Sequence, residues 1–135
     1  MKVLVDTCIW SLALRSNIGK NKLITDELVA LMDEGRLSII GPIKQEILSA
    51  YKDKTKFNKI RQHLADFPNT EIEDIDYETA AEFHSICRGK GVQGSHIDFL
   101  ICAISVRCKM NIFTNDSDFE RYKKHLPIEL YNPKS

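Results

Sequence analysis

The chain has 135 residues, of which 43 % are hydrophobic and 28 % charged, and this fits one domain (1–135) with a core of ordinary size. The formal net charge is zero, so a nucleic acid would have to be held locally, by a basic rim or by metal ions. No run approaches the ~18 apolar residues of a membrane span, and the start lacks the pattern of a secretory signal. We therefore expect a cytoplasmic protein with no membrane partner.

The four cysteines are not spaced as a metal or redox motif. None forms a C-x-x-C pair, so neither a zinc ribbon nor thioredoxin chemistry is indicated. Cys102 falls in an apolar helical pattern and Cys87 in an amphipathic one. This is typical of reduced, partly buried thiols in a cytosolic protein.

The first part of the chain alternates between strand and helix patterns. Short apolar runs predict strands, and apolar residues at helical spacing predict helices. Gly35 ends one helix, and Gly41-Pro42 opens the next with proline at a tolerated first-turn position. The predicted elements are, in order, a strand at Val3–Val5, a helix at Ile9–Leu14, a turn at residues 17–21, a helix at Leu23–Met32, a strand at Leu37–Ile40 and a helix at Gly41–Tyr51.

The second part continues the alternation with two polar interruptions. Pro68-Asn69 ends a basic helix, and a loop with three glycines, Gly89–Gly94, separates two later helices. Glu71–Ile75 alternates isoleucine with acids, as a half-exposed or edge strand would. The predicted elements are a helix around Phe57–Leu64, a strand at Glu71–Ile75, helices at Tyr77–Arg88 and Ser95–Arg107, a strand at Asn111–Thr114, a helix at Asp116–Lys124 and a strand at Ile128–Tyr131.

Short apolar strands that alternate with helices predict an α/β fold, with a parallel sheet covered on both faces. In such sheets the functional crevice lies at the carboxyl ends of the strands. Asp6 falls at the end of the first predicted strand. We found no internal repeat or linker that would divide the chain.

Two acids of the first half lie close to predicted strand ends. Asp6 could instead cap the helix that follows it. Glu46 lies on the flank of an apolar stripe, beside Ile43 and Ala50, where a surface glutamate would also fit. It follows the second strand by about one helical turn, so it too is expected near the carboxyl ends of the sheet.

The second half adds acids that helix capping explains only in part. Asp98 fits an S-x-x-D capping pattern that begins at Ser95, although its helix is apolar enough to be central. Residues Thr114–Asp118 follow a strand directly and include Asp116 and Asp118. One of them can cap the next helix, and Ser117 with Glu120 offers another capping box. Capping does not require five polar residues in a row.

Four acidic places at one edge of a sheet require a counter-charge. Two like charges ~4 Å apart repel by about 4 kcal/mol at an effective dielectric constant of 20. No lysine or arginine stands among these acids themselves, and Lys44 and Arg121 are only nearby, so a divalent metal is the natural neutraliser. Carboxylates without local His or Cys ligands suit Mg²⁺ or Mn²⁺, and His96 is expected to be exposed rather than a ligand. Such a metal indicates phosphoryl transfer, in which Glu46 or Asp98 could serve as the base.

Four segments together resemble the PIN-domain nucleases, and most closely the VapC-type toxins of toxin–antitoxin pairs. They are "VLVDTCIWSLALR", "GPIKQEIL" with Glu46, "GSHIDFLICAIS" with Asp98, and "IFTNDSDFERY". The resemblance covers essentially the whole chain. It implies a three-layer α/β/α domain with a central, mostly parallel sheet, and a Mg²⁺- or Mn²⁺-dependent endoribonuclease.

The resemblance also implies roles for particular residues. Asp6, Glu46, Asp98 and Asp116 take the positions of the family's catalytic, metal-binding acids, and Asp118 that of a further metal-binding acid. Thr114 takes the position of a hydroxyl that orients the first aspartate. Relatives often carry Asn or Ser two places after that aspartate, where this chain has Cys8, so a supporting role there is in doubt.

Partners follow from the same resemblance. Relatives commonly form homodimers and are held inactive by a cognate antitoxin that lies across the early helices. The apolar residues of Ile9–Leu14 and Leu23–Met32 suit such contacts, and core packing explains them equally well. An RNA rim or a solvated helix face would account for the basic stretch of Lys52, Lys54, Lys56, Lys59 and Arg61.

Three other functions fit parts of the pattern. An aspartyl phosphatase would use Asp6 as nucleophile, but it generally needs a second aspartate where Cys8 stands. A receiver-like module needs a central strand near mid-chain, where "TEIEDIDYE" is too polar. A non-catalytic PIN-fold binding protein would not need all four acids. The sequence therefore favours a metal-dependent ribonuclease.

Overall fold

A short parallel sheet carries the fold. The computed structural model describes residues 1–15 and 22–133, so the turn expected at 17–21 lies outside the described residues. The strands are β1 (Val3–Val5), β2 (Leu37–Ser38) and β3 (Asn111–Phe113), in the order β2-β1-β3. Leu4 pairs with Ser38 on one side and with Ile112 on the other. All three residues of the central strand β1 are fully buried, which explains its uninterrupted apolar run.

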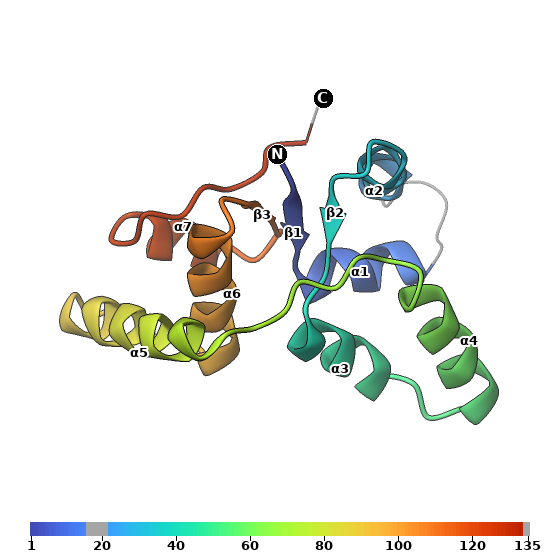
Figure 1. Cartoon of the computed structure of the whole chain (residues 1–135), viewed down its shortest axis with the longest axis horizontal. Helices are drawn as coiled ribbons and strands as arrows, with labels where there is room; N and C mark the ends of the chain where they lie inside the picture. The colour runs from blue at the N-terminus through green and yellow to red at the C-terminus, as the bar shows by residue number, and fades with distance from the viewer. Residues whose placement is uncertain (16–21, 134–135) are drawn as a thin grey trace.

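Helices lie on both sides of this sheet, as the three-layer α/β/α prediction requires. In Figure 1, α5, α6 and α7 lie to the left of the strands, α2 and α4 lie to the right, and α3 lies below them. The helices are α1 (Thr7–Leu14), α2 (Lys22–Asp33), α3 (Gly41–Ser49), α4 (Lys54–Leu64), α5 (Asp74–Gly89), α6 (His96–Arg107) and α7 (Asp118–Lys123). Along α6, every residue from Phe99 to Ser105 is buried, which confirms this helix as central.

Two predicted strands are wrong, and a third is shorter than expected. Residues 128–131 form only a single parallel bridge, between Leu130 and Ile112 of β3. The second strand ends at Ser38, because Ile39 makes one isolated bridge, to Asn69, and Ile40 already precedes the first turn of α3.

No helix in residues 1–15 and 22–133 combines the length and the apolar character that crossing a bilayer requires.

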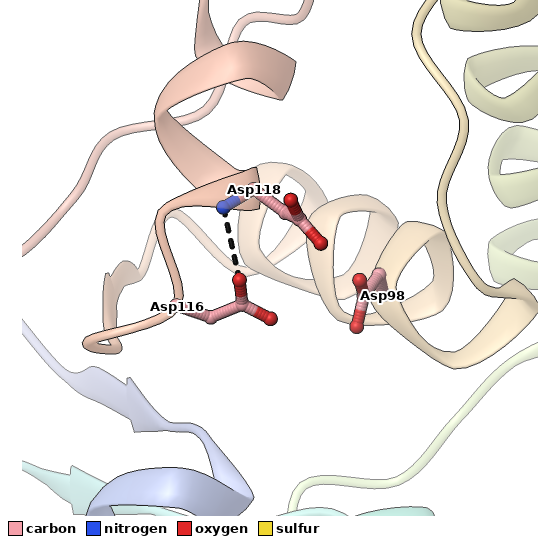
Figure 2. Close-up of side chains that lie close together, drawn as sticks. All are labelled: Asp98, Asp116 and Asp118. Atoms are coloured by element: carbon pink, nitrogen blue, oxygen red, sulfur yellow. Dashed lines mark hydrogen bonds between the residues drawn. The ribbon is translucent and has the colours of Figure 1, made fainter.

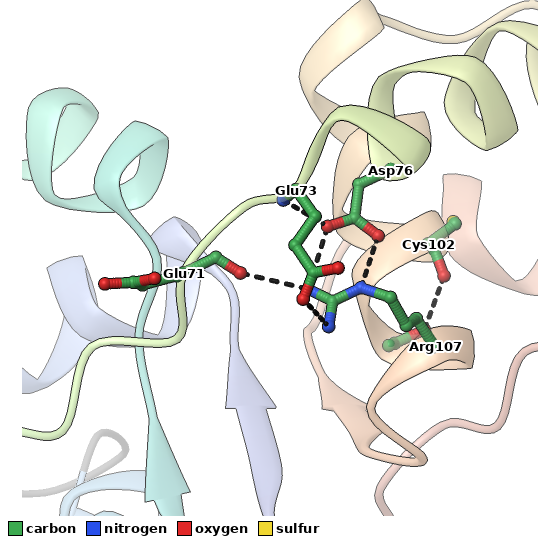
Figure 3. A network of polar contacts seen from close by, with 6 residues as sticks. Glu71, Glu73, Asp76, Cys102 and Arg107 are labelled. Atoms are coloured by element: carbon green, nitrogen blue, oxygen red, sulfur yellow. Dashed lines mark hydrogen bonds and ion pairs between the residues drawn. The ribbon is translucent and has the colours of Figure 1, made fainter.

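The strand predicted at Glu71–Ile75 is replaced by the start of a helix. Glu73 is the N-cap of α5 and forms a capping box with Asp76, whose carboxylate accepts the Glu73 N–H at 2.8 Å. The guanidinium of Arg107, from α6, binds both carboxylate oxygens of Asp76 at 2.7 and 2.8 Å and the Glu71 carbonyl at 2.9 Å (Figure 3). These acids therefore cap the start of α5 and join it to α6. The alternation of acids with isoleucine, from which a strand was predicted, gave no sign of either role.

Candidate metal centre

Asp6 leaves the sheet at the end of β1 and is the N-cap of α1, with 8 % of its surface exposed. One carboxylate oxygen, Oδ1, accepts the Thr7 N–H at 2.8 Å, so the capping interpretation is correct for that oxygen. The other, Oδ2, accepts a hydrogen bond from the Thr114 hydroxyl at 2.9 Å. Asp6 thus caps a helix and also joins the carboxyl ends of β1 and β3.

Burial raises the pKa of the Asp6 carboxyl above its ordinary value. Hydrogen bonds, the strongest from Thr114, act in the opposite direction, and the negative charge of Glu46 adds to the rise. A carboxyl that is both buried and close to another acid is costly to ionise without a cation. The cost of ionising Asp6 is the first indication that this site binds a cation.

Thr114, directly after β3, connects three parts of the site. Its hydroxyl donates to Asp6 and accepts the Asp116 N–H at 3.0 Å. The thiol of Cys8 lies 3.4 Å from the same hydroxyl and donates to Asp6 Oδ2 at 3.6 Å. Burial raises the pKa of the Cys8 thiol, which therefore keeps its proton at neutral pH. Cys8 supports the orientation of Asp6 through weak hydrogen bonds, a role the sequence left in doubt.

Glu46 reaches the site from α3. Its Oε1 accepts a hydrogen bond from the Thr7 hydroxyl at 3.1 Å, one residue after Asp6. Its side chain is exposed, unlike that of Asp6. The structure therefore brings the second predicted acid to the end of β1, across 39 residues of sequence.

Asp98 enters from the first turn of α6. The Ser95 side chain accepts the Asp98 N–H at 3.0 Å, so Ser95 performs the capping that the S-x-x-D pattern predicts. The Asp98 carboxylate accepts the hydroxyl of Tyr122, from α7, at 2.7 Å. Burial raises the pKa of Asp98, and the carboxylates of Asp6 and Asp116 add to the rise although the hydrogen bonds oppose it. Asp98 is therefore close enough to both acids to feel their charge.

Asp116 and Asp118 complete the group from the loop before α7. Asp116 Oδ1 accepts the Asp118 N–H at 2.9 Å, whereas Ser117 forms no side-chain cap, so the predicted Ser117–Glu120 capping box is absent. Each of Asp98, Asp116 and Asp118 offers an oxygen, and these oxygens lie within 4.8 Å of one another. Figure 2 shows the three side chains pointing toward the same space.

A hard divalent cation fits this donor set. Two ligands of one Mg²⁺, each at about 2.1 Å, stand about 4 Å or less apart, so oxygens within 4.8 Å need only a small adjustment to share an ion. The donors are carboxylates alone, which favours Mg²⁺ or Mn²⁺ over zinc. Asp6 and Glu46 lie beside this three-carboxylate group rather than in it. His96 is exposed, stacks on His84 and is not a member of the three-carboxylate group.

Two residues of α7 contact the acids: the sequence indicated Arg121 only as a nearby cation, and it did not indicate Tyr122 at all. Arg121 forms an ion pair with Asp118 and supplies part of the counter-charge. Tyr122 is fully buried, and burial together with Asp98 raises the pKa of its hydroxyl, which keeps its proton and remains a donor. A Cβ added at Gly94 would collide with this hydroxyl. The glycine before Ser95 therefore makes room for the Tyr122–Asp98 hydrogen bond.

Replacing Tyr122 with phenylalanine should weaken Mn²⁺ binding by about tenfold to a hundredfold, because the Asp98 carboxylate loses the donor that orients it. Calorimetric titration of the purified protein with Mn²⁺ measures the effect. Tyr131→Phe is the matched control, since it removes a tyrosine–carboxylate hydrogen bond, to Glu27, elsewhere in the chain. Equal Mn²⁺ affinity in Tyr122→Phe and wild type would show that the hydroxyl does not position Asp98.

Comparison with known proteins gives the family of the chain and structures that share its fold. The sequence profile of the PIN domain matches residues 3–125. Comparison with curated proteins gives no significant match. Among solved structures, VapBC2 from Rickettsia felis, bound to a DNA fragment from its promoter, is 19 % identical with a TM-score of 0.79, and 98 % of each chain is covered.

Two further structures are similar over nearly the full length. VapBC-1 from nontypeable Haemophilus influenzae is 12 % identical with a TM-score of 0.78, covering 98 % of each chain. A toxin–antitoxin complex from Klebsiella pneumoniae is 19 % identical with a TM-score of 0.69, covering 99 % of each chain. At these identities the likeness concerns the fold, and the profile match concerns the family. The chain belongs to the PIN domain family.

Proposed function

We propose that this chain is a Mg²⁺- or Mn²⁺-dependent endoribonuclease and the toxin of a toxin–antitoxin pair. The observation that supports it best is the group of Asp98, Asp116 and Asp118 oxygens within 4.8 Å, beside the buried Asp6. Nucleases of the PIN family typically use divalent metals held by such acids, and the chain belongs to that family.

The proposed roles follow from the contacts. Asp98, Asp116 and Asp118 would hold the cation together with Asp6, and Thr114 keeps Asp6 in place. A bound cation would offset the phosphate charge and lower the pKa of a water. Glu46 stands outside the three-carboxylate group and is exposed, which makes it the better placed of the two candidate bases to accept the proton of that water.

Cleavage of single-stranded RNA tests the proposal. We expect cleavage in Mg²⁺ or Mn²⁺, loss of cleavage in EDTA, and recovery when excess metal is returned. Cleavage that persists in EDTA would contradict the metal requirement. Absence of cleavage of any RNA by wild type with metal present would contradict the ribonuclease assignment itself.

An antitoxin partner is the second part of the proposal. Solved neighbours include a structure described as a toxin–antitoxin complex. Helices α1 and α2 border an apolar cleft of about 510 Å³, whose lining includes Trp10, Leu14, Met32 and Phe67. The Trp10 Nε1–H is buried with no acceptor among the described residues, so a bound segment could supply one. This cleft coincides with the early helices at which an antitoxin was expected.

Expression in bacteria tests the toxin assignment. Growth arrest is expected for wild type, and Asp6→Asn should relieve it. Homodimerisation belongs to the same proposal, and the exposed apolar residues Ile75 and Ile86, on one flank of α5, offer a surface for it. Normal growth on expression of soluble wild type would contradict the toxin assignment and leave the nuclease assignment to the cleavage assay.

A further inference from the structure

A second cleft, of about 570 Å³, lies at the far end of α1 from the acids and is lined by positive charge. Lys56, Lys59 and His63 come from α4, and Arg15 is the C-cap of α1. In residues 1–15 and 22–133, none of these four side chains forms an ion pair. Unpaired lysine and arginine side chains in a cleft favour an anionic ligand.

Helix α4 is rich in positive charge, and its basic residues lie on two opposite flanks. The helix carries four Lys and Arg residues and no Asp or Glu, whereas the whole chain is neutral. Lys56, Lys59 and His63 are spaced i, i+3 and i+7, so they share one flank, which lines the cleft. Lys54 and Arg61 lie on the opposite flank of the helix and do not line it. The basic stretch of the sequence is thus two surfaces rather than one.

Two of the helices that border the acids, α1 and α3, lead to this cleft. Helix α1 begins at the Asp6 cap and reaches Arg15 after eight residues, or about 12 Å. Helix α3 carries Glu46, and Tyr51 of the cleft lining follows five residues later. Figure 1 shows α1 and α3 running from the strand ends toward α4. The separation is one that a few nucleotides of single-stranded RNA can span.

We propose that the cleft of Arg15, Lys56, Lys59 and His63 binds the phosphodiester backbone of the RNA substrate a few nucleotides away from the scissile phosphate. The inference rests on the proposed ribonuclease function. Lysine and arginine bind phosphates without reading sequence, and Tyr51 offers a face on which a base can stack. An extended RNA anchored there would be aligned along α1 and α3 with its cut site at the acids.

Binding of a 2′-O-methyl RNA 12-mer in EDTA, followed by fluorescence anisotropy, tests the proposal without requiring cleavage. The double variant Lys56→Gln/Lys59→Gln should bind at least about tenfold more weakly. Its log–log salt slope should fall by about 1.4, the value expected when two lysines no longer neutralise phosphates of a single strand. The control Lys54→Gln/Arg61→Gln removes the same charge from the same helix. It should change affinity by less than about twofold.

Three outcomes would overturn the proposal. An equal loss in both double variants would mean that bulk charge, not the cleft, attracts RNA. Unchanged RNA affinity with weaker binding of polyglutamate would assign the cleft to an acidic protein segment. If Lys56→Gln/Lys59→Gln lost the same fraction of cleavage activity on a 12-mer as on a trinucleotide, which is too short to reach the cleft, the effect would lie at the acids. If wild type cleaves no RNA but the anisotropy result holds, the ribonuclease proposal fails and the cleft stands.

Discussion

Replacing Asp98 with asparagine should lower RNA cleavage by at least about a hundredfold while leaving the fold intact, because one metal ligand becomes neutral. The same loss is expected for Asp6→Asn. Asparagine caps helices as well as aspartate, so α1 should persist, and Ser95 still caps α6. Removing one of several crowded negative charges should leave the melting temperature unchanged or raise it.

Glu120→Gln is the matched control for these substitutions. Glu120 is an exposed acid in the first turn of α7, next to the carboxylate group but outside it. The Glu120→Gln variant should cleave RNA as wild type does. Full activity in either Asp98→Asn or Asp6→Asn, measured on soluble folded protein, would contradict the proposed roles of these acids.

Replacing Arg107 with methionine should lower the free energy of unfolding by roughly 3 kcal/mol at pH 7, because it leaves the Asp76 carboxylate buried without a cation. The Asp76 side chain is 1 % exposed and receives two hydrogen bonds from Arg107. Methionine retains the apolar stem, so the loss concerns charge. For a chain of this length the melting temperature should fall by about 10 °C. Arg88→Met, an exposed arginine without an ion pair among the described residues, is the control.

The pH dependence of this effect has a definite sign. Burial alone would raise the pKa of Asp76, but hydrogen bonds from Arg107 and the Glu73 N–H outweigh it and hold the pKa below its ordinary value. A depressed native pKa stabilises the fold above the unfolded-state pKa of about 3.9, and that stability is lost as the pH falls through the native pKa. The gap between wild type and Arg107→Met should therefore shrink below about pH 4. A constant gap from pH 7 to pH 3 would contradict the ionic origin.

The sequence predicts the location of the acids better than the boundaries of the elements. Parallel strands end at one edge of a sheet, so acids after Val5 and Phe113 had to lie near each other once the strands were recognised. The strand wrongly predicted at Glu71–Ile75 came from the alternation of polar and apolar residues, and such a pattern reports only which side chains are locally exposed. Its true partner, Arg107, comes more than thirty residues later, and no local pattern connects the two.

The contacts of α7 could not be predicted for a similar reason. Tyr122 resembles an ordinary core aromatic until α7 is known to pack on α6, where its hydroxyl meets Asp98. In the sequence, Gly94 is one loop glycine among three. One signal was available: Arg121 follows Asp118 by three residues, the spacing at which a helical ion pair forms. Long-range packing supplied the rest.

Manganese binding to the purified protein, without RNA, tests the central claim most directly. Calorimetric titration should show saturable Mn²⁺ binding to wild type, and the double variant Asp98→Asn/Asp116→Asn should lose it while Glu120→Gln keeps it. Undiminished binding in the double variant, or no saturable binding to wild type at millimolar Mn²⁺, would contradict the account.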